Sequence, residues 1–450
     1  MSRKVESDPA FRPTTLAAWL AYLETLHPKA IALGLDRVRA VAARMGAQMT
    51  FACPVVTVTG TNGKGSTCAM LASILGCAGY RVGAYSSPHL MRYNERVRIA
   101  GREATDAELV AALDAVEDAR TAAVDADGAS TPLTYFEFGT LAALSLFARE
   151  RLDAVVLEVG LGGRLDAVNI VDPDVAVVTS VDLDHMDYLG PTREDIGREK
   201  AGIFRAGRPV VCADPAPTTA MLEYAQAQGA PLYLIGRDYG FRAEGTQWQY
   251  HGPGGRRFGL PYPALRGAYQ LSNAATALAA LGLVADRLPV TAGAIRDGFS
   301  IVELAGRFQV LPGRPTVVLD VAHNPHAARA LADTLGAMSY HPSTLAVFGI
   351  LADKDIAGVV GAMRARVDRW FVATLPGPRG TGASALAEAL VRAGIAANAI
   401  RTFDDVASAL GAAQGEAGEA DRIIVFGSFL TVAAALAAIR ARTHSPPRHG

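Results

Sequence analysis

The stretch from residue 55 to residue 67, VVTVTGTNGKGST, constrains the fold of this chain more than any other. It begins with β-branched residues over the length of a strand and continues with three glycines and a lysine. The next segment, residues 68–75, has the apolar spacing of a helix. A strand, a glycine loop and a helix in this order aim backbone N–H groups at a phosphate. We therefore expect Lys64 to reach the phosphates of a nucleotide, with the hydroxyl of Ser66 or Thr67 near Mg²⁺.

The glycine loop departs from the common phosphate-loop pattern G-x-x-x-x-G-K-[ST]. That pattern requires glycine where this chain has Val58, and serine or threonine where it has Gly65. The alternative interpretation is an ordinary turn of an α/β protein. We favour phosphate binding because Lys64 directly follows a glycine at the start of a predicted helix.

Length and composition limit the classes of protein to which the chain can belong. With 450 residues it predicts two or three domains, and 50% hydrophobic residues provide sizeable cores. The net charge of −1 gives no electrostatic footprint for nucleic acid or an anionic membrane. Four cysteines without a C-x-x-C pair are typical of reduced thiols, which favours a cytoplasmic location. No apolar stretch is long enough to predict a membrane span.

Strands and helices alternate over the first 300 residues, which predicts an α/β fold with a parallel sheet. Residues 14–49 are expected to form two helices hinged near Pro28, and residues 240–265 a small antiparallel excursion. The other predicted strands cover residues 81–87, 152–158 and 174–181, and the other predicted helices cover residues 106–120, 134–150, 272–287 and 291–302.

The pattern breaks at residues 303–315, which are rich in glycine and proline, and we place the domain boundary there. Predicted strands then resume at residues 317–320, 345–348, 370–373 and 423–426. The chain is therefore predicted to have a parallel-sheet domain with the phosphate loop over residues 1–303, which the family resemblance described below implies to be an ATPase domain. A smaller Rossmann-like α/β domain is predicted over residues 304–450.

Polar residues follow the predicted strands at the edge where ligands bind to parallel sheets. Besides the glycine loop, these are Ser87, Glu158 and His185. A carboxylate with hydroxyls and waters suits Mg²⁺, although Glu158 at a strand end could instead pair with a helix dipole. His185 is either a structural histidine or, with Asp182 and Asp184, a second centre of polar chemistry.

The second predicted domain repeats this arrangement. Residues 320–325, DVAHNP, follow its first strand, and residues 427–429 follow its last. Two sheets with polar residues at their carboxyl edges predict a cleft between the domains. The alternative is turn chemistry alone, since Asn-Pro is common in turns.

Seven segments occur in the order found in one known family. These are GTNGKGS at 60–66, SSPHL at 86–90 with NERV at 94–97, LEVGLGGRLDA at 157–167, DH at 184–185, EKAG at 199–202, GRF at 306–308 and DVAHNP at 320–325. Over roughly residues 14–440 the chain resembles the bifunctional bacterial dihydrofolate synthases/folylpolyglutamate synthases of the Mur ligase superfamily. The family's nucleotide loop accounts for the misfit at positions 58 and 65.

The resemblance implies an ATP site and two Mg²⁺ sites. The residues implied to bind ATP are Thr61, Asn62, Gly63, Lys64, Gly65, Ser66, Asn273, Arg307 and Asp320. Ser87 and Glu158 would bind one Mg²⁺ and His185 the second. Lys200 matches a lysine that CO₂ carbamylates in this family, which would make it a metal ligand, whereas the chain alone predicts a surface lysine.

The resemblance also implies sites for an acceptor and for L-glutamate. The implied pterin site comprises Ala30, Ile31, Ala32, Leu33, Thr134, Tyr135, Phe136, Glu137, Leu165, Asp166 and Ala167. His323 and Ser428 would face the incoming glutamate. Ala32 is a departure, because relatives usually carry aspartate there and an acidic group that could bind the pterin is missing.

The chain is thus expected to be a monomeric ATP- and Mg²⁺-dependent ligase acting on small molecules. It would add L-glutamate to dihydropteroate and to the γ-carboxylate of reduced folates through an acyl phosphate, with Lys64, Lys200, Arg307 and His323 as catalytic residues. A folylpolyglutamate synthase alone, a cell-wall Mur ligase, a nucleotide switch and a non-enzymatic binder are the alternatives. The short stretch before Gly60 leaves no room for a nucleotide-sugar domain, and the chain has no Asn-Lys-x-Asp guanine motif.

Overall fold

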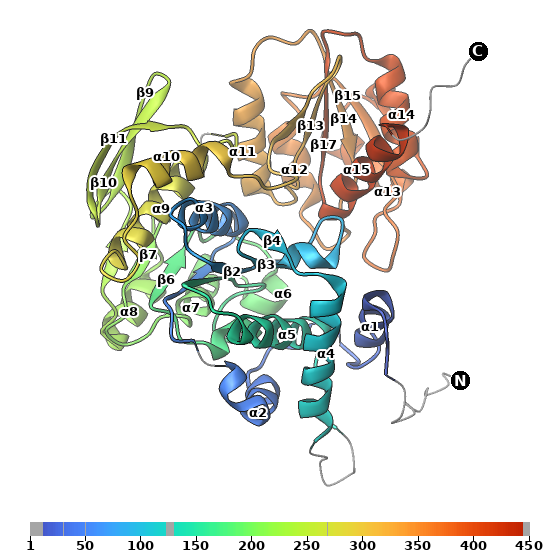
Figure 1. Ribbon diagram of the computed structural model, residues 1–450. Coiled ribbons are helices and arrows are strands. Elements are labelled where there is room, and N and C mark those ends of the chain that lie inside the picture. The colour runs from blue at the N-terminus through green and yellow to red at the C-terminus, as the bar shows by residue number, and fades with distance from the viewer. Residues whose placement is uncertain (1–11, 30, 50, 123–129, 268, 444–450) are drawn as a thin grey trace.

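The structure is a computed structural model that describes residues 12–29, 31–49, 51–122, 130–267 and 269–443. It contains an eight-stranded sheet, a three-stranded sheet and a six-stranded sheet. The eight-stranded and six-stranded sheets lie in separate parts of the molecule, joined by the chain after residue 301 (Figure 1). The predicted α/β fold is therefore confirmed.

The glycine loop leaves the centre of the eight-stranded sheet, whose order is β4-β3-β2-β5-β1-β6-β7-β8. Strand β1 (Val55–Thr59) pairs in parallel with β5 (Ala154–Glu158) and with β6 (Val175–Val178). The remaining strands are β2 (Val82–Tyr85), β3 (Val97–Ile99), β4 (Arg102–Glu103), β7 (Val210–Cys212) and β8 (Leu232–Leu234). Only β3 and β4 run antiparallel to their neighbours. The loops after β1, β2, β5 and β6 therefore meet at one edge.

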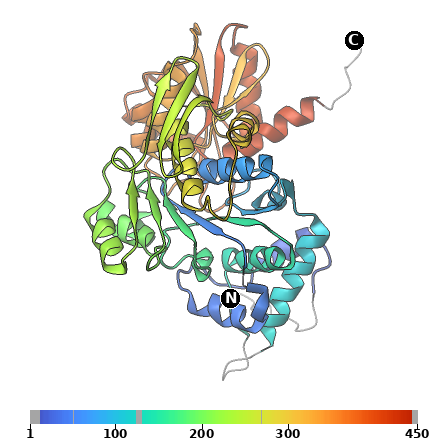
Figure 2. The same cartoon turned by 60° about the vertical axis from the view of Figure 1, so that its left-hand side comes forward.

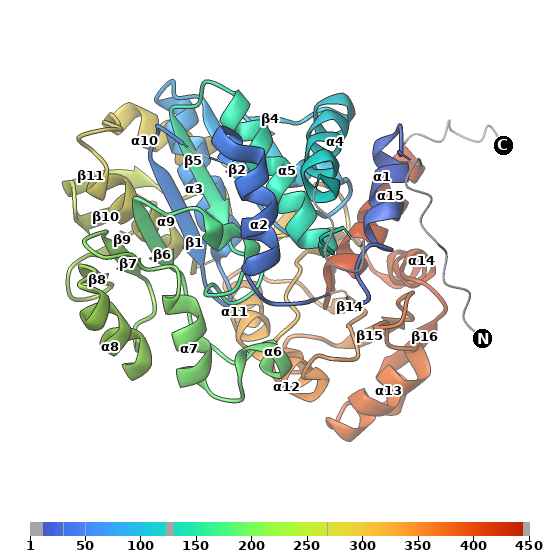
Figure 3. The ribbon, with the colours of Figure 1, turned by 90° about the horizontal axis from the view of Figure 1, so that it is seen from below.

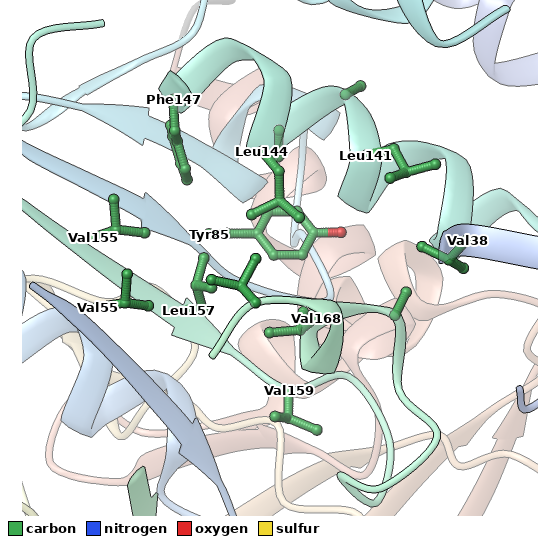
Figure 4. Packing of buried hydrophobic residues seen from close by; sticks show 14 of the residues in the cluster. Val38, Val55, Tyr85, Leu141, Leu144, Phe147, Val155, Leu157, Val159 and Val168 are labelled. Carbon is green, nitrogen blue, oxygen red and sulfur yellow. The ribbon is translucent and has the colours of Figure 1, made fainter. Parts of the chain in front are cut away.

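Both faces of this sheet are buried under helices, which explains why its strands are apolar without interruption. Val55, Val155 and Leu157 pack into the core on one face, where Figure 4 shows them beside helix α5. Val56 and Val156 pack on the other face. The first core contains residues from α1 (Leu16–Leu23), α2 (Asp36–Met45), α4 (Asp106–Thr121), α5 (Tyr135–Arg149), α7 (Arg193–Ala201) and α8 (Thr219–Gln228). The second contains residues from α3 (Lys64–Cys77), α9 (Tyr269–Leu283) and α10 (Ala292–Ile301).

The predicted antiparallel excursion is confirmed. Strands β9 (Gly240–Glu244), β10 (Gln247–Gly252) and β11 (Gly255–Pro261) form an antiparallel sheet at one side of the molecule (Figure 2). Trp248 is fully buried, and its ring centroid lies 5.6 Å from that of Phe299 on α10. This small sheet packs against α9 and α10 and adds Trp248, Tyr250 and Leu260 to the second core.

The second part of the chain has the strand order β12-β13-β17-β14-β15-β16. Its strands are β12 (Gln309–Leu311), β13 (Thr316–Leu319), β14 (Thr344–Phe348), β15 (Arg369–Ala373), β16 (Ile400–Phe403) and β17 (Arg422–Phe426). Helices α11 (Pro325–Gly336), α12 (Ile356–Met363) and α13 (Ala383–Arg392) cover one face, and α14 (Val406–Glu416) and α15 (Phe429–Thr443) cover the other. Seen from below, α11 and α12 lie next to the short helix α6 (Met186–Leu189) of the first part (Figure 3).

The predicted break at residues 303–315 contains a strand. Residues 309–311 form β12, which pairs antiparallel with β13 at the edge of the second sheet. This strand has only three residues, and Pro312 and Pro315 follow it before β13, which hides it from any sequence pattern. The chain changes from one sheet to the other between Ile301 and Gln309. The proposed domain boundary at residues 303/304 stays a prediction.

Candidate active site

One cavity of about 970 Å³ lies where the carboxyl edges of the two large sheets meet. It collects the predicted site residues from both parts of the chain. They are Ile31, Ala32, Leu33, Thr61, Asn62, Gly63, Lys64, Gly65, Ser66, Ser87, Thr134, Tyr135, Phe136, Glu137, Glu158, Leu165, Asp166, Ala167, His185, Lys200, Asn273, Arg307, Asp320, His323 and Ser428. Ala30 falls outside the described residues.

The glycine loop requires glycine for steric reasons at two positions. Gly60 has a φ of +149°, and a Cβ there would lie 1.9 Å from the hydroxyl oxygen of Thr179. Gly63 has a φ of +89°, and a Cβ there would lie 2.7 Å from Oδ1 of Asn273. The loop is also held by the segment that follows β6, because the N–H of Thr61 donates to the carbonyl of Ser180 at 2.8 Å. It therefore presents its backbone to the cavity in a fixed conformation.

Lys64 begins helix α3, four residues before the predicted helix start. Its Nζ donates to the carbonyl oxygens of Gly60 and Thr61, at 2.8 and 3.2 Å. Burial lowers the pKa of Lys64, while the carboxylates of Glu158 and Asp184 oppose that shift. The ammonium therefore lies inside the loop, at the position that the phosphate-binding hypothesis requires.

The misfit at position 65 has a structural explanation. A Cβ on Gly65 would lie 3.5 Å from Oε1 of Glu158, so glycine leaves the space beside this carboxylate open. The hydroxyl comes one residue later, on Ser66, whose Oγ accepts from Nε2 of Gln270 at 3.3 Å. Asn273 donates in turn to Oε1 of Gln270 at 2.9 Å. Glycine at position 65 thus leaves space beside the carboxylate of Glu158, and the hydroxyl of Ser66 is hydrogen-bonded to Gln270 on α9.

Glu158 lies at the end of β5 with only 4% of its surface exposed. Its Oε2 accepts the backbone N–H of Ser87 at 3.1 Å, and burial raises its pKa against the opposing charge of Lys64. Nothing else anchors this carboxylate among the hydrogen bonds of the described residues. One carboxylate and a hydroxyl beside a phosphate loop fit Mg²⁺, which keeps waters and takes further oxygens from substrate phosphates.

The described residues contain no group of three His, Cys, Asp or Glu side chains arranged to hold a metal ion by themselves. A closed site of the zinc type therefore does not occur in that part of the chain. A site completed by water and by a nucleotide is compatible with this finding.

His185 is the N-cap of α6 and has a left-handed φ of 51°. Burial lowers its pKa to about 4, so the imidazole is neutral at physiological pH and has a lone pair for a metal. The adjacent Asp184 accepts from Nζ of Lys354 at 2.7 Å and from Nδ2 of Asn324 at 3.0 Å. The polar centre that the sequence left open is therefore a contact between the two parts of the chain.

Lys200 is not the surface lysine that the chain alone predicted. It lies on α7, is 3% exposed and faces the cavity. Burial, helped by the positive charge of Lys64, lowers its pKa to about 7. A large fraction of Lys200 is therefore an uncharged amine at neutral pH.

In the predicted acceptor site several polar groups already have partners within the protein. Thr134 caps α5 and Glu137 completes the capping box, as the sequence signature S/T-x-x-E suggests. Glu137 also accepts from Nη2 of Arg37 at 2.7 Å, and the same nitrogen donates to the carbonyl of Ala32 at 2.8 Å. Asp166 accepts the N–H groups of Leu161 and Val168. Their contact with a ligand stays a prediction.

The second part of the chain contributes the facing wall. The guanidinium of Arg307 lies 5.0 Å from the ring centroid of Phe429. Asp320 accepts the N–H groups of Phe308 and Ala322, both at 2.8 Å, and burial raises its pKa. Nε2 of His323 lies 3.7 Å from Oδ2 of Asp184. Ser428 accepts from the N–H of Leu430 at 3.1 Å.

Sequence reasoning missed the cavity residues His326 and Lys354, and it gave no role to Arg96 and Asn324, although both lie in quoted segments, NERV and DVAHNP. Asn324 had a readable signal, since an Asn before a Pro at the start of a helix is a typical N-cap, and its Oδ1 accepts from Ala327.

Comparison with known proteins agrees with this arrangement. The family model "Mur ligase middle domain" matches residues 58–281, and "Mur ligase, glutamate ligase domain" matches residues 306–429. A dihydrofolate synthase/folylpolyglutamate synthase of Escherichia coli is 48% identical over 427 residues, covering 95% of this chain and 96% of the relative. The Haemophilus influenzae protein of the same name is 42% identical over 93% of this chain and 96% of its own length.

The chain is also similar to solved structures of proteins with these activities. The E. coli protein FolC in complex with DHPP and ADP has a TM-score of 0.89 at 48% identity, covering 96% of this chain and 99% of that one. A bifunctional folylpolyglutamate synthase/dihydrofolate synthase with Mn, AMPPNP and L-glutamate bound has a TM-score of 0.85 at 47% identity, covering 95% and 98%.

The chain belongs to the Mur ligase family.

Within that family its relatives are the bifunctional dihydrofolate synthases/folylpolyglutamate synthases, as the sequence motifs indicated. The prediction of an ATP-dependent ligase with a Mur ligase fold is confirmed. No helix within the described residues has both the length and the apolar character needed to cross a membrane.

Proposed function

We propose that this protein adds L-glutamate to dihydropteroate, and to the γ-carboxylate of reduced folates, at the expense of ATP. The observation that carries the proposal is the single cavity of about 970 Å³ in which the phosphate loop, Glu158 and the facing wall of the second part meet. A folylpolyglutamate synthase without the first activity remains the second candidate, because Ala32 leaves the acceptor site without a carboxylate at that position.

The proposed reaction has two displacements. A carboxylate oxygen of the acceptor attacks the γ-phosphorus of ATP, the bond from that phosphorus to the β–γ bridging oxygen breaks, and ADP leaves. The glutamate amine then attacks the acyl carbon, the bond to the phosphate oxygen breaks, and inorganic phosphate leaves while the nitrogen loses a proton. Lys64 and Arg307 supply positive charge where the transferring phosphoryl group and the leaving groups gain negative charge.

Mg²⁺ is proposed to bind at Ser87 and Glu158 and, in a second site, at His185 and carbamylated Lys200. When bound, it would neutralise charge on the phosphate oxygens. In the carbamylation, the neutral amine of Lys200 attacks the carbon of CO₂, a C–N bond forms and one proton is released. The lowered pKa of Lys200, about 7, supports this step, because only the uncharged amine is a nucleophile.

The remaining proposals concern the residues of the facing wall, closure of the cavity, the oligomeric state and the location of the protein. Arg307, Asp320 and Asn273 are proposed to contact ATP, and His323 and Ser428 to face L-glutamate. The cavity lies between two separately packed parts, so their closure would exclude water from the acyl phosphate. We further propose a monomer in the cytoplasm, consistent with four cysteines that form no C-x-x-C pair.

The test is a turnover assay in which ADP formation is followed with each substrate omitted in turn. The proposal requires ADP and dihydrofolate in equal amounts only when dihydropteroate, L-glutamate, ATP and Mg²⁺ are all present. Glutamate-dependent turnover with tetrahydrofolate but not with dihydropteroate would leave the second candidate. ATP hydrolysis indifferent to both acceptors would contradict the proposal.

A further inference from the structure

Arg96 is a buried cation without a carboxylate partner in the described part of the chain. It ends the short helix η2 (Tyr93–Arg96), is 9% exposed and lines the cavity. Its Nε donates to Nδ1 of His89 at 2.8 Å. Burial and the charge of Arg96 itself lower the pKa of His89 to about 4, so this partner is neutral. Buried arginines are normally paired, which makes this one an exception that needs an explanation.

Aromatic rings hold the guanidinium in place from two sides. Its central carbon lies 5.4 Å from the ring centroid of Tyr93 and 5.7 Å from that of Tyr135. The two rings are 5.9 Å apart in an edge-to-face arrangement. Tyr85 is a further hydrogen-bond partner of the Arg96 side chain. With His89 on Nε, Tyr85 beside it and rings at its sides, Arg96 is pre-organised, and its five N–H donors outnumber these partners, so donors remain for an anion.

The position of Arg96 indicates which anion it would bind. On one side, the carbonyl oxygen of Arg96 accepts the N–H of Ser86 at 2.9 Å, and the N–H of the next residue, Ser87, donates to Glu158. On its other side Tyr135 begins α5, whose first turn also contributes Phe136 to the cavity. Arg96 therefore lies between the phosphate-side residues and the aromatic acceptor-side residues.

The loop that carries these residues also contacts the second part of the chain. Leu90 and Met91 pack against the core that contains Val432 and Leu436 of α15. The segment between β2 and β3 reaches toward the second sheet in Figure 1. Glu95 holds this loop by accepting the N–H groups of Leu90, Met91 and Arg92 at 2.7 to 2.8 Å. The guanidinium is thus fixed to a rigid segment and does not belong to a mobile side chain at the rim.

We propose that Arg96 binds the reactive carboxylate of the acceptor and keeps hold of the same group after it becomes an acyl phosphate. A planar guanidinium matches both a carboxylate and a phosphate through paired N–H donors. This inference rests on the proposed function and adds to it the residue that recognises the reacting end of the acceptor, whichever ring system lies beyond.

The test compares two ligands that differ only in charge at the reacting end, dihydropteroate and the analogue with a carboxamide in place of the carboxylate. Dissociation constants are measured by titration in the absence of ATP for the wild-type protein, Arg96→Gln and Arg96→Lys. The wild-type protein should prefer the acid by roughly 10- to 100-fold, as for a charge-assisted hydrogen bond. Arg96→Gln should bind acid and amide within about twofold of each other, and Arg96→Lys should lie between.

Arg98→Gln is the matched control. Arg98 lies two residues away on β3 with its side chain 48% exposed and paired with Glu103. This variant should keep the wild-type preference for the acid. An Arg96→Gln protein that melts like the wild type and still prefers the acid would overturn the proposal. An Arg98→Gln protein that loses the preference for the acid as fully as Arg96→Gln would also overturn it. If Arg96→Gln fails to fold, the Arg96→Lys titration decides. A wild-type preference for the acid in Arg96→Lys would show that paired guanidinium donors do not bind the carboxylate, and would overturn the proposal. If the wild-type protein turns over and the Arg96 variants keep its preference for the acid, only this inference is refuted. If the wild-type protein shows no glutamate-dependent turnover, the proposed function is refuted.

Discussion

Single lysines carry much of the chemistry proposed for this molecule. The chain has five lysines, and three of them, Lys64, Lys200 and Lys354, line the cavity between the two parts. Elsewhere the chain uses arginine for nearly all its basic positions. Lysine differs from arginine in being a compact charge whose pKa responds to burial, and both Lys64 and Lys200 have lowered pKa values.

The first prediction concerns Lys64. Lys64→Ala removes a cation from the phosphate loop and should lower kcat/KM by about 10²- to 10³-fold, as for loss of one transition-state donor. The melting temperature should change little, because the two bonds of Nζ are to its own loop. Lys29→Ala, at an exposed lysine, is the control. A folded Lys64→Ala protein with near-normal turnover would remove Lys64 from the phosphate site.

The second prediction concerns Lys200. Its lowered pKa means that the uncharged amine increases as the pH rises through about 7, so at constant dissolved CO₂ carbamate should increase over the same range. The signal is a carbamate resonance in ¹³C NMR of protein equilibrated with ¹³CO₂, lost in Lys200→Ala and on acidification. Lys200→Ala should also lose at least about 10- to 100-fold in activity, with partial recovery in formate or acetate. A wild-type spectrum identical to that of the alanine variant would make Lys200 an uncarbamylated amine.

At the residue scale the sequence could locate the groups but not their exposure. The glycine loop, Ser87, Glu158 and His185 were readable because each follows an apolar strand, and parallel strands end at one edge. The burial of Lys200 was unreadable, because the helix that carries it has a polar sequence and its buried side is set by tertiary packing. Lys354 was missed for the same reason. Arg96 lies in the quoted segment NERV, but nothing in the sequence shows that its side chain faces a cavity.

At the scale of elements, long segments were predictable and short ones were not. The capped helices α4 and α5 lie within one residue of their predicted bounds, because each begins with a capping box. Strands β3, β4, β7, β8 and β12 have two or three residues each, too few for a periodic pattern to stand out. The two helices predicted within residues 14–49 are α1 and α2, and Pro28 lies in the connection between them, which is longer than a hinge.

The two parts of the chain are joined across the cavity by a buried ion pair. Nζ of Lys354, before α12, lies 2.7 Å from Oδ1 of Asp184, and the two side chains are 6% and 10% exposed. Nδ2 of Asn62 in the glycine loop also donates to Oδ1 of Asn324 at 3.3 Å. These contacts connect the phosphate loop directly to the second part.

The third prediction follows from this pair. Lys354→Met leaves the buried Asp184 without the cation that lies 2.7 Å from it, a change that costs about 3–5 kcal/mol in comparable buried pairs. Because the partners belong to different parts, the cost should fall on their association, and hydrogen exchange at residues 303–315 should become faster. Arg81→Met, which breaks the exposed pair with Glu150, should change exchange there little. Unchanged exchange in Lys354→Met would show that the pair does not hold the parts together.

At the scale of the whole molecule the cavity belongs to neither sheet alone. Its walls come from the carboxyl edges of both sheets, connected by one crossing of the chain between Ile301 and Gln309. The sequence predicted such a cleft from polar groups after strands in both halves, and the shared cavity bears this out. It could not predict the ion pairs across the cleft, which depend on how the two parts are oriented.

The fourth prediction concerns closure of this cleft. ATP with dihydropteroate should reduce the radius of gyration in solution scattering, with the segment at residues 303–315 as the hinge. The physical reason is that both walls hold cations that an anionic nucleotide would draw together, Lys64 on one side and Arg307 on the other. ATP alone and dihydropteroate alone serve as references. The same radius with and without both ligands at saturation would count against closure.

The central claim is that the acceptor carboxylate passes through an acyl phosphate in this cavity. Dihydropteroate labelled with ¹⁸O in both carboxylate oxygens tests it most directly, because the bond that breaks in the second displacement leaves one of these oxygens on phosphate. We predict that inorganic phosphate isolated after turnover with ATP and L-glutamate carries one ¹⁸O for each molecule of dihydrofolate formed. Unlabelled phosphate accompanying the formation of dihydrofolate would contradict the account.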